Sequence, residues 1–106
     1  MALTRSFHET VVARVRRDPA FARGLFDEAV DAFLNGEPGV ARLVLRDLVN
    51  ATVGFERLSR RTGRPSKSLH RMLSSIGNPS MDNLAAIIDA LRGHLKVSLK
   101  TKTVAA

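Results

Sequence analysis

The stretch from Leu58 to Leu91, LSRRTGRPSKSLHRMLSSIGNPSMDNLAAIIDAL, decides the fold. Its glycine, proline and helix-capping residues predict three short helices. The first ends at Gly63, because glycine tolerates the positive φ of a tight turn. The second begins near Pro65, since proline is well tolerated at the first helical position. The third follows the turn at Gly77-Asn78-Pro79 and is capped by Ser80.

The second of these helices is predicted to be amphipathic. Apolar residues recur along it at i, i+3, i+4 and i+7, the spacing of a face that packs on a core. They are Leu69, Met72, Leu73 and Ile76. The other side is cationic and hydroxylic, with Arg64, Lys67, Arg71, Ser74 and Ser75, flanked by Ser66, Ser68 and His70. The third helix repeats the apolar spacing with Leu84, Ile87, Ile88 and Leu91.

The first two helices are expected to cross closely. Phe55, Leu58 and Thr62 mark one face of the first, and the small Ser59 leaves room for the second to approach. Two short helices that cross steeply over a short glycine-containing turn are typical of a helix-turn-helix.

Three longer helices are predicted upstream. The first is marked by its apolar residues Phe7, Val11, Val12 and Val15. Asp18 caps the second ahead of Pro19. The wide apolar face of the second helix is expected to be well covered; it consists of Phe21, Leu25, Phe26, Ala29, Val30, Phe33 and Leu34. It ends at Asn35-Gly36. The third, which ends at Gly54, is apolar around most of its circumference, as in the centre of a bundle; it carries Val40, Leu43, Val44, Leu45, Leu48 and Val49.

The spacing of the apolar residues changes after Arg92-Gly93 from a helical period to a period of two. Leu95, Val97 and Leu99 alternate with polar residues, as in a half-buried β-strand. No second strand is evident in the chain, so we expect this one to pair with a copy of itself in a dimer or with a partner's sheet. The alternative is an unstructured basic tail.

Length and composition limit the function classes. A chain of 106 residues makes one domain with an appended arm, and small domains gain least from burial, so a partner or dimer would help. It has no cysteine, which excludes disulfides, thiol catalysis and cysteine-based zinc sites. No apolar run reaches the roughly 18 residues of a membrane span. A secretory leader is not evident at the N-terminus, so a cytoplasmic protein is expected.

The net charge of +7 is unevenly distributed. Residues 1–36 are neutral, 37–63 carry +2, 64–80 carry +3 without any acid, and 81–106 carry +2. The excess therefore coincides with the predicted helix-turn-helix. A field of this sign attracts phosphate backbones, although basic proteins are common and many charged faces are simply solvated.

The same stretch resembles a known family. It is similar to the Cro/C1-type (XRE) helix-turn-helix and, more closely, to the addiction-module antidote proteins, the antitoxins of toxin–antitoxin pairs. The resemblance rests on Arg46-Asp47-Leu48, Leu58-Ser59-Arg60-Arg61-Thr62-Gly63, Ser66 to Ser74, Gly77-Asn78-Pro79-Ser80, Leu84 and Ala90-Leu91, and it covers roughly three-quarters of the chain. Upstream, an Asp-Pro and a helix end near Asn35-Gly36-Glu37-Pro38 also fit.

The resemblance implies a fold and a set of partners. The fold class is all-α, a lambda-repressor-like helix-turn-helix bundle with N-terminal helices and a short C-terminal β-strand. Its parts are an N-terminal helical extension at 1–36, the DNA-binding domain at 37–92, and a strand and tail at 93–106. The implied function is a repressor that binds operator DNA as a homodimer, neutralises a small RelE-like toxin and represses its own operon.

Two departures from the family pattern concern the predicted reading helix. Arg64 and Pro65 stand where the family has an apolar residue and a capping serine. Phe55 stands where the wider superfamily often has a glutamine that touches phosphate. The sequence therefore leaves the first residue of the reading helix undefined to within one position of that in the family. The phosphate contact that the glutamine makes is either lost here or supplied by another residue.

Groove geometry assigns roles to the polar residues, because a recognition helix enters the major groove with its N-terminal residues toward the base edges. The base-reading candidates are Ser66, Lys67, His70 and Arg71. The phosphate-binding candidates are Arg57, Arg60, Arg61, Arg64, Ser68, Ser74 and Asn78. For Arg60 or Arg61 alone, a merely solvated helix surface is an equally good interpretation.

Other function classes have weaker support. His8, His70 and His94 lack metal-ligand spacing, and no orienting third residue accompanies His70 and its neighbouring serines. Asp27 and Asp31 share a helix face, but Arg23 nearby indicates an ion pair. We therefore expect no enzyme, metal or cofactor. A stand-alone regulator without a toxin and a protein–protein interaction module remain as alternatives.

Overall fold

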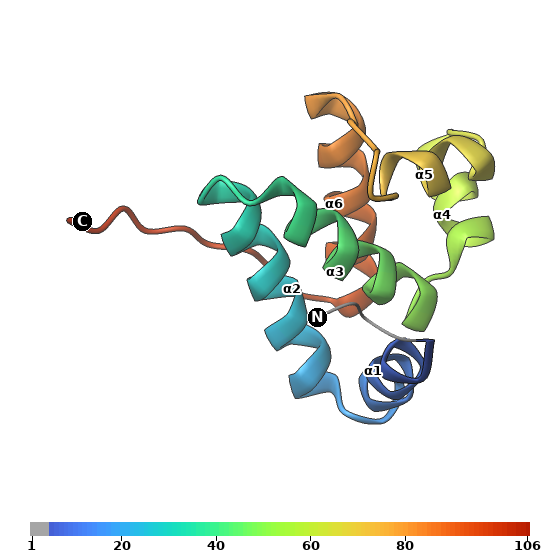
Figure 1. The fold of residues 1–106 in the computed structure, drawn as a ribbon, viewed down its shortest axis with the longest axis horizontal. Coiled ribbons are helices and arrows are strands. Elements are labelled where there is room, and N and C mark those ends of the chain that lie inside the picture. Colours follow the sequence, from blue (N-terminus) through green and yellow to red (C-terminus); the bar gives the residue numbers. More distant parts are fainter. Residues whose placement is uncertain (1–4) are drawn as a thin grey trace.

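The computed structural model describes the backbone of residues 5–106 and the side chains from Glu9 onward. This part of the chain is all-α and carries the helices α1 (Arg5–Arg17), α2 (Pro19–Leu34), α3 (Pro38–Ala51), α4 (Phe55–Thr62), α5 (Ser66–Met72) and α6 (Met81–Leu95). Figure 1 shows α3 crossing the middle of the molecule, with α1 and α2 on one side, α4 and α5 on the other, and α6 running behind it. The predicted all-α class is confirmed.

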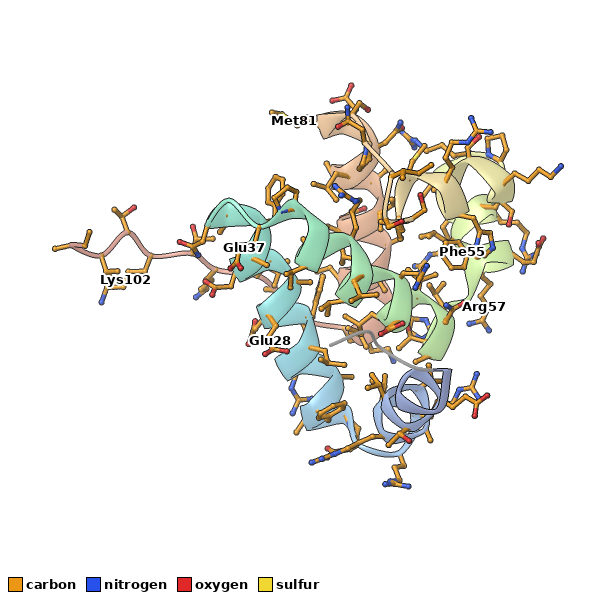
Figure 2. All side chains as sticks on the ribbon, viewed as in Figure 1. Glu28, Glu37, Phe55, Arg57, Met81 and Lys102 are labelled. Carbon is orange, nitrogen blue, oxygen red and sulfur yellow. The ribbon has the colours of Figure 1, made fainter. Side chains whose placement is uncertain are left out.

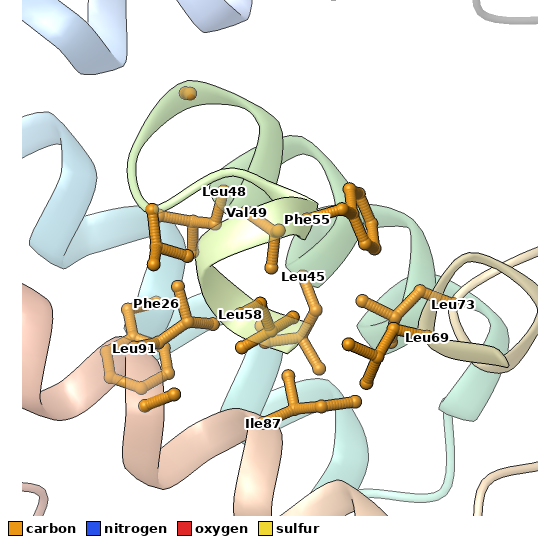
Figure 3. Packing of buried hydrophobic residues seen from close by; sticks show 14 of the residues in the cluster. Phe26, Leu45, Leu48, Val49, Phe55, Leu58, Leu69, Leu73, Ile87 and Leu91 are labelled. Carbon is orange, nitrogen blue, oxygen red and sulfur yellow. The ribbon is translucent and has the colours of Figure 1, made fainter. Parts of the chain in front are cut away.

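The core gathers around α3. Leu45, Leu48 and Val49 of this helix are fully buried, and one cluster joins them to apolar side chains of every other helix. Figure 3 shows Phe26 of α2 and Leu91 of α6 within this cluster. The central place predicted for this helix is confirmed, except that Val40 at its N-terminal end is 47% exposed.

The helix caps follow the sequence expectations. Asp18 accepts hydrogen bonds from the backbone N–H groups of Ala20 and Phe21 at 3.1 and 3.2 Å, and Pro19 opens α2. Ser80 accepts one from the N–H of Asn83 at 3.1 Å. Such caps satisfy N–H groups that have no partner in the first helical turn.

Two apolar expectations are wrong. Ile76, predicted to face the core, is 87% exposed, because α5 ends at Met72 and the helical register does not continue to it. The face of α2 is not well covered at its end, where Phe33 is 43% and Leu34 57% exposed. The side chain of Phe7, assigned to the face of α1, lies outside the described residues.

The loop after α5 depends on a glycine. A Cβ atom at Gly77 would lie closer than 3.0 Å to the backbone oxygens of Arg71 and Met72. The chain can therefore turn back this tightly against the end of α5 only without a side chain there. Leu73, just past the helix, is buried and anchors the loop to the core.

The C-terminal segment differs from the prediction. The last helix continues past Gly93 to Leu95 and ends at Lys96, which has a left-handed φ of 57°. Leu95 is therefore helical. The segment from Val97 onward is extended, but the described chain forms no β-strand, because a strand needs a hydrogen-bonding partner and this single chain supplies none. Val97 and Leu99 are half-buried against the core cluster, and the following residues project from the body in Figure 1.

The length and hydrophobicity of a helix determine whether it can span a membrane. None of the described helices is both long and apolar enough to cross a bilayer.

Candidate nucleic-acid interface

The turn between α4 and α5 is built from local hydrogen bonds. Gly63 adopts φ 70°, which favours glycine, and its N–H donates to the carbonyl of Ser59 at 2.9 Å. The Ser59 hydroxyl donates to the carbonyl of Arg64 at 2.6 Å. Pro65 is extended and precedes α5, which begins at Ser66. Ser59, predicted to let the two helices cross closely because it is small, thus also connects the turn to α4.

The short helix α5 is held by its apolar side. Leu69 is fully buried within α5, and Leu58 of α4 lies in the same cluster. Lys67, His70 and Arg71 are exposed on α5. These three residues stand at i, i+3 and i+4, which places them on one face of a helix. The structure therefore brings three of the four base-reading candidates together on the surface, while Ser66 is half-buried at the start of the helix.

His70 does not project freely. Its imidazole stacks on the ring of Phe55, with centroids 3.7 Å apart and planes inclined by 19°. Phe55 is buried at the start of α4, so it forms a fixed shelf for the imidazole. The residue that departs from the superfamily pattern thus supports a base-reading candidate. The sequence contained the two rings but no signal that they would meet.

Three of the phosphate-binding candidates lie on α4. Arg57, Arg60 and Arg61 are exposed, and Figure 2 shows Arg57 at the outer edge of α4. Arg61 also reaches α6, where its Nη1 donates to the carbonyl of Ala90 at 3.5 Å. The exposed arginines therefore form a cationic group on α4, of which Arg61 lies against α6.

Arg64 is placed differently. It is half-buried, its Nε donates to Oδ1 of Asn83 on α6, and its Nη1 donates to the carbonyl of Thr62 at 2.7 Å. Its guanidinium ties the turn to the first turn of α6. Two of its donors are thus used inside the protein, which makes Arg64 a positioning residue in this structure.

The remaining phosphate candidates lie on or after α5. Asn78 is exposed, and Ser68 is half-buried. The Ser74 hydroxyl donates to the carbonyl of Arg71 at 2.8 Å, which stabilises the end of α5.

Arg42 is a contributor that the sequence reasoning missed. From α3, its Nε donates to the carbonyl of Ser74 at 3.1 Å, and its Nη2 donates to that of Ser75 at 3.3 Å. It therefore holds the loop that follows α5. The two partners are 32 and 33 residues away, so no local pattern could have indicated this clamp.

Positive charge also gathers between α4 and α6. Burial lowers the pKa of His94 below its ordinary value, and the positive charges of Arg57 and Arg61 lower it further. A lowered histidine pKa is the expected response to neighbouring cations, because they oppose the addition of another positive charge.

The predicted tail residues do not join this surface. Val97 and Leu99 pack elsewhere on the core, and Leu95 belongs to α6. The candidate site therefore consists of the exposed edge of α5 and the arginines of α4, with Phe55, Arg64 and Arg42 holding it in place.

Comparisons with family models, curated proteins and solved structures find no match to this chain.

Proposed function

We propose that this protein is a sequence-specific regulator that binds double-stranded DNA and uses α5 as the helix that enters the major groove. One observation carries the proposal. The exposed edge of α5 lies in a segment, residues 57–80, that contains six cationic residues and no acid. They are Arg57, Arg60, Arg61, Arg64, Lys67 and Arg71. A cationic segment of this kind, exposed at Arg57, Arg60, Arg61, Lys67 and Arg71, favours a polyanionic partner.

The size of α5 suits this role. With its side chains an α-helix is about 10–12 Å across, and the major groove is about 12 Å wide, so a helix such as α5 can enter it. Lys67 and Arg71 can donate to O6 and N7 of guanine, and His70 can donate or accept according to its tautomer. Base reading therefore falls to Lys67, His70 and Arg71, with Ser66 beside them.

The arginines of α4 have a complementary role. Arg57, Arg60 and Arg61 are exposed on α4, the helix that precedes α5, and phosphate contacts orient a protein on the duplex without reading its sequence. We expect the phosphate backbone on one side of the groove to lie along this helix. Arg64 then acts indirectly, through the position of the turn.

The proposal is tested by selecting bound duplexes from a random pool and then measuring affinity by fluorescence anisotropy at about 50 and about 200 mM salt. Lys67→Ala and Arg71→Ala are each expected to weaken binding to the selected sequence by about tenfold or more and to relax the base preference. Arg17→Ala is the matched control, because it removes an exposed cation from α1. If Lys67→Ala and Arg71→Ala bind like the control, α5 is not the reading helix.

Protein binding is the second candidate function. Phe33 and Val40 flank the turn between α2 and α3 and are 43% and 47% exposed, well away from α5 in the sequence. Exposed large apolar side chains on either side of one turn favour a protein partner. The resemblance implies that such a partner would be a RelE-like toxin and that the regulator would be its antidote, acting on its own operon.

A stand-alone regulator is distinguished from an antidote by the adjacent reading frames. Co-expression with the product of a short neighbouring gene should give a stable complex and relieve growth arrest if the antidote role holds. Phe33→Ser with Val40→Ser should abolish that complex and leave DNA affinity unchanged. If no neighbouring product binds, the regulator acts alone.

A further inference from the structure

A groove runs between α2 and the C-terminal segment. It has a volume of about 980 Å³ and is lined on one wall by α2 and on the other by residues 99–104. Figure 2 labels Glu28 on the first wall and Lys102 on the second. It contains none of the candidate DNA-binding residues.

The α2 wall is acidic with an apolar end. Asp27, Glu28 and Asp31 are exposed along it, and Leu34 follows at its C-terminal end. Asp27 and Glu28 form no ion pair with any described residue. In particular, the ion pair expected between Arg23 and Asp27 is absent from the described part of the chain, so these carboxylates are open to a cationic partner from outside.

The C-terminal arm, residues 99–106, has the opposite character. It carries Lys100 and Lys102 and no acid, and Val104 is 72% exposed. No described residue makes a backbone hydrogen bond to the arm; the last such bond in this region runs from the N–H of Val97 to the carbonyl of Arg92. An extended segment with an open backbone edge is a template for pairing with another strand.

We propose that this groove binds the C-terminal arm of a second copy of the chain, so that two molecules exchange arms about a two-fold axis. The chain itself carries both complementary parts, which are lysines with Val104 on the arm and carboxylates with Leu34 on α2. A two-fold interface is self-complementary, so each contact would occur twice. The arm cannot serve its own molecule in this way, because it already forms one wall of the groove and Lys100 and Lys102 make no ion pair there.

The exchange also supplies the missing strand pairing. The two arms run in opposite directions about a two-fold axis, as antiparallel strands require. The unpaired backbone groups of each arm would then form hydrogen bonds with the arm that lines the partner's groove. The predicted strand would thus form only in the dimer, where its backbone groups find partners.

A second copy fits the groove better than the other occupants. A nucleic acid is repelled by the acidic wall, and a membrane surface offers no matching cationic strand. A basic segment of another protein has the right charge, and it is an outcome that the test separates.

The first experiment uses the full chain and measures its mass in solution over a range of concentrations. We expect a dimer for the native protein and a monomer for a chain that ends at Ser98. Lys100→Glu with Lys102→Glu should raise the dimer dissociation constant by about tenfold or more, because like charges would face each other in both copies of the contact. Arg16→Glu with Arg17→Glu, an equal change in charge at exposed sites of α1 outside the groove, should leave it unchanged.

The second experiment decides between exchange and a contact within one molecule. The arm variant Lys100→Glu/Lys102→Glu is mixed with a groove variant, Asp27→Lys/Asp31→Lys. Each alone should dimerise more weakly than the native protein, by about tenfold or more, whereas the mixture should recover the native dissociation constant. In the mixture every acidic arm meets a basic groove and every basic arm an acidic one. If only one chain carrying all four changes restores dimers, or if the native protein stays monomeric, the proposal is overturned.

Two further controls separate possible causes of failure. The thermal unfolding of each variant shows whether its fold persists. A native monomer that is captured by a basic peptide would also overturn the proposal, in favour of a partner from another protein. None of these readouts involves DNA, so the exchange can fail while DNA binding holds, and the reverse.

Discussion

The imidazole of His70 lies flat on the ring of Phe55, with centroids 3.7 Å apart. This contact joins the exposed edge of α5 to a buried residue of α4. It fixes the orientation of the side chain that stands between Lys67 and Arg71 in the proposed reading face. The aromatic shelf thus couples the packing of the two helices to the polar surface above them.

Weakening this stack should weaken DNA binding more than it weakens the fold. Phe55→Leu keeps an apolar side chain in the core and should lower the free energy of unfolding by only about 1 kcal/mol. It should nevertheless reduce affinity for the selected DNA by at least about threefold. In a double-mutant cycle with His70→Ala, measured by anisotropy, the two losses should not add, because both remove the same contact. Additive losses would mean that the stack does not position His70.

Arg64 should behave as a structural residue. Removing its side chain leaves Asn83 and the carbonyl of Thr62 without this donor, so Arg64→Ala should lower the free energy of unfolding by about 1–3 kcal/mol. Urea denaturation measures this change. The salt dependence of DNA binding should keep the native slope.

Arg60→Ala is the matched comparison for Arg64. Its side chain is exposed on α4, so stability should remain within about 0.5 kcal/mol. The slope of log affinity against log salt should instead fall by about one, as expected for a lost phosphate contact. The opposite assignment would follow if Arg64→Ala changed the slope and left stability intact.

Two glycines should respond in opposite ways to alanine. At Gly77 an added Cβ collides with the backbone of α5, so Gly77→Ala should cost more than about 2 kcal/mol of stability. At Gly24, exposed within α2, the same atom meets nothing within 4 Å, and Gly24→Ala should stabilise by about 0.5–1 kcal/mol. Thermal or urea unfolding of both variants checks the pair. A neutral Gly77→Ala would show that the loop after α5 can relax.

Stability should fall as the pH drops below about 6.5, the ordinary pKa of histidine. Burial and then Arg57 and Arg61 lower the pKa of His94 in the folded state, so the unfolded chain binds a proton first. The stability is therefore complete above that pH and is lost as the pH falls through the lowered pKa. His94→Gln should flatten this dependence in urea titrations at a series of pH values, whereas a native profile in the variant would exclude His94 as its source.

Much of the helical framework could be predicted because its signals are local. A cap such as Asp18 or Ser80 acts on N–H groups two or three residues away, and both caps lie where expected. The turn at Gly63 depends on a backbone conformation that glycine favours. The amphipathic spacing likewise indicated Leu69 and Ile87 as core residues, and both are fully buried.

The pattern failed where a helix ended early or a segment lacked a partner. Ile76 matched the apolar spacing, yet α5 stops at Met72 because the chain turns back at Gly77. Leu95, Val97 and Leu99 have the alternation of a strand, but Leu95 lies in α6, and one chain cannot pair the backbone groups of the residues that follow. Periodicity describes which side of an element is apolar and does not show how far the element extends.

By itself, the sequence determined the helical class, the order and caps of the helices, and the concentration of positive charge around residues 57–80. These properties depend on single residues and their near neighbours. Only the tertiary structure decided which polar side chains remain available. Arg64 is held by Asn83, 19 residues away, Arg42 holds the loop after α5, and Phe55 supports His70. Such pairings arise when distant helices pack on one core, so they depend on geometry that no local pattern contains.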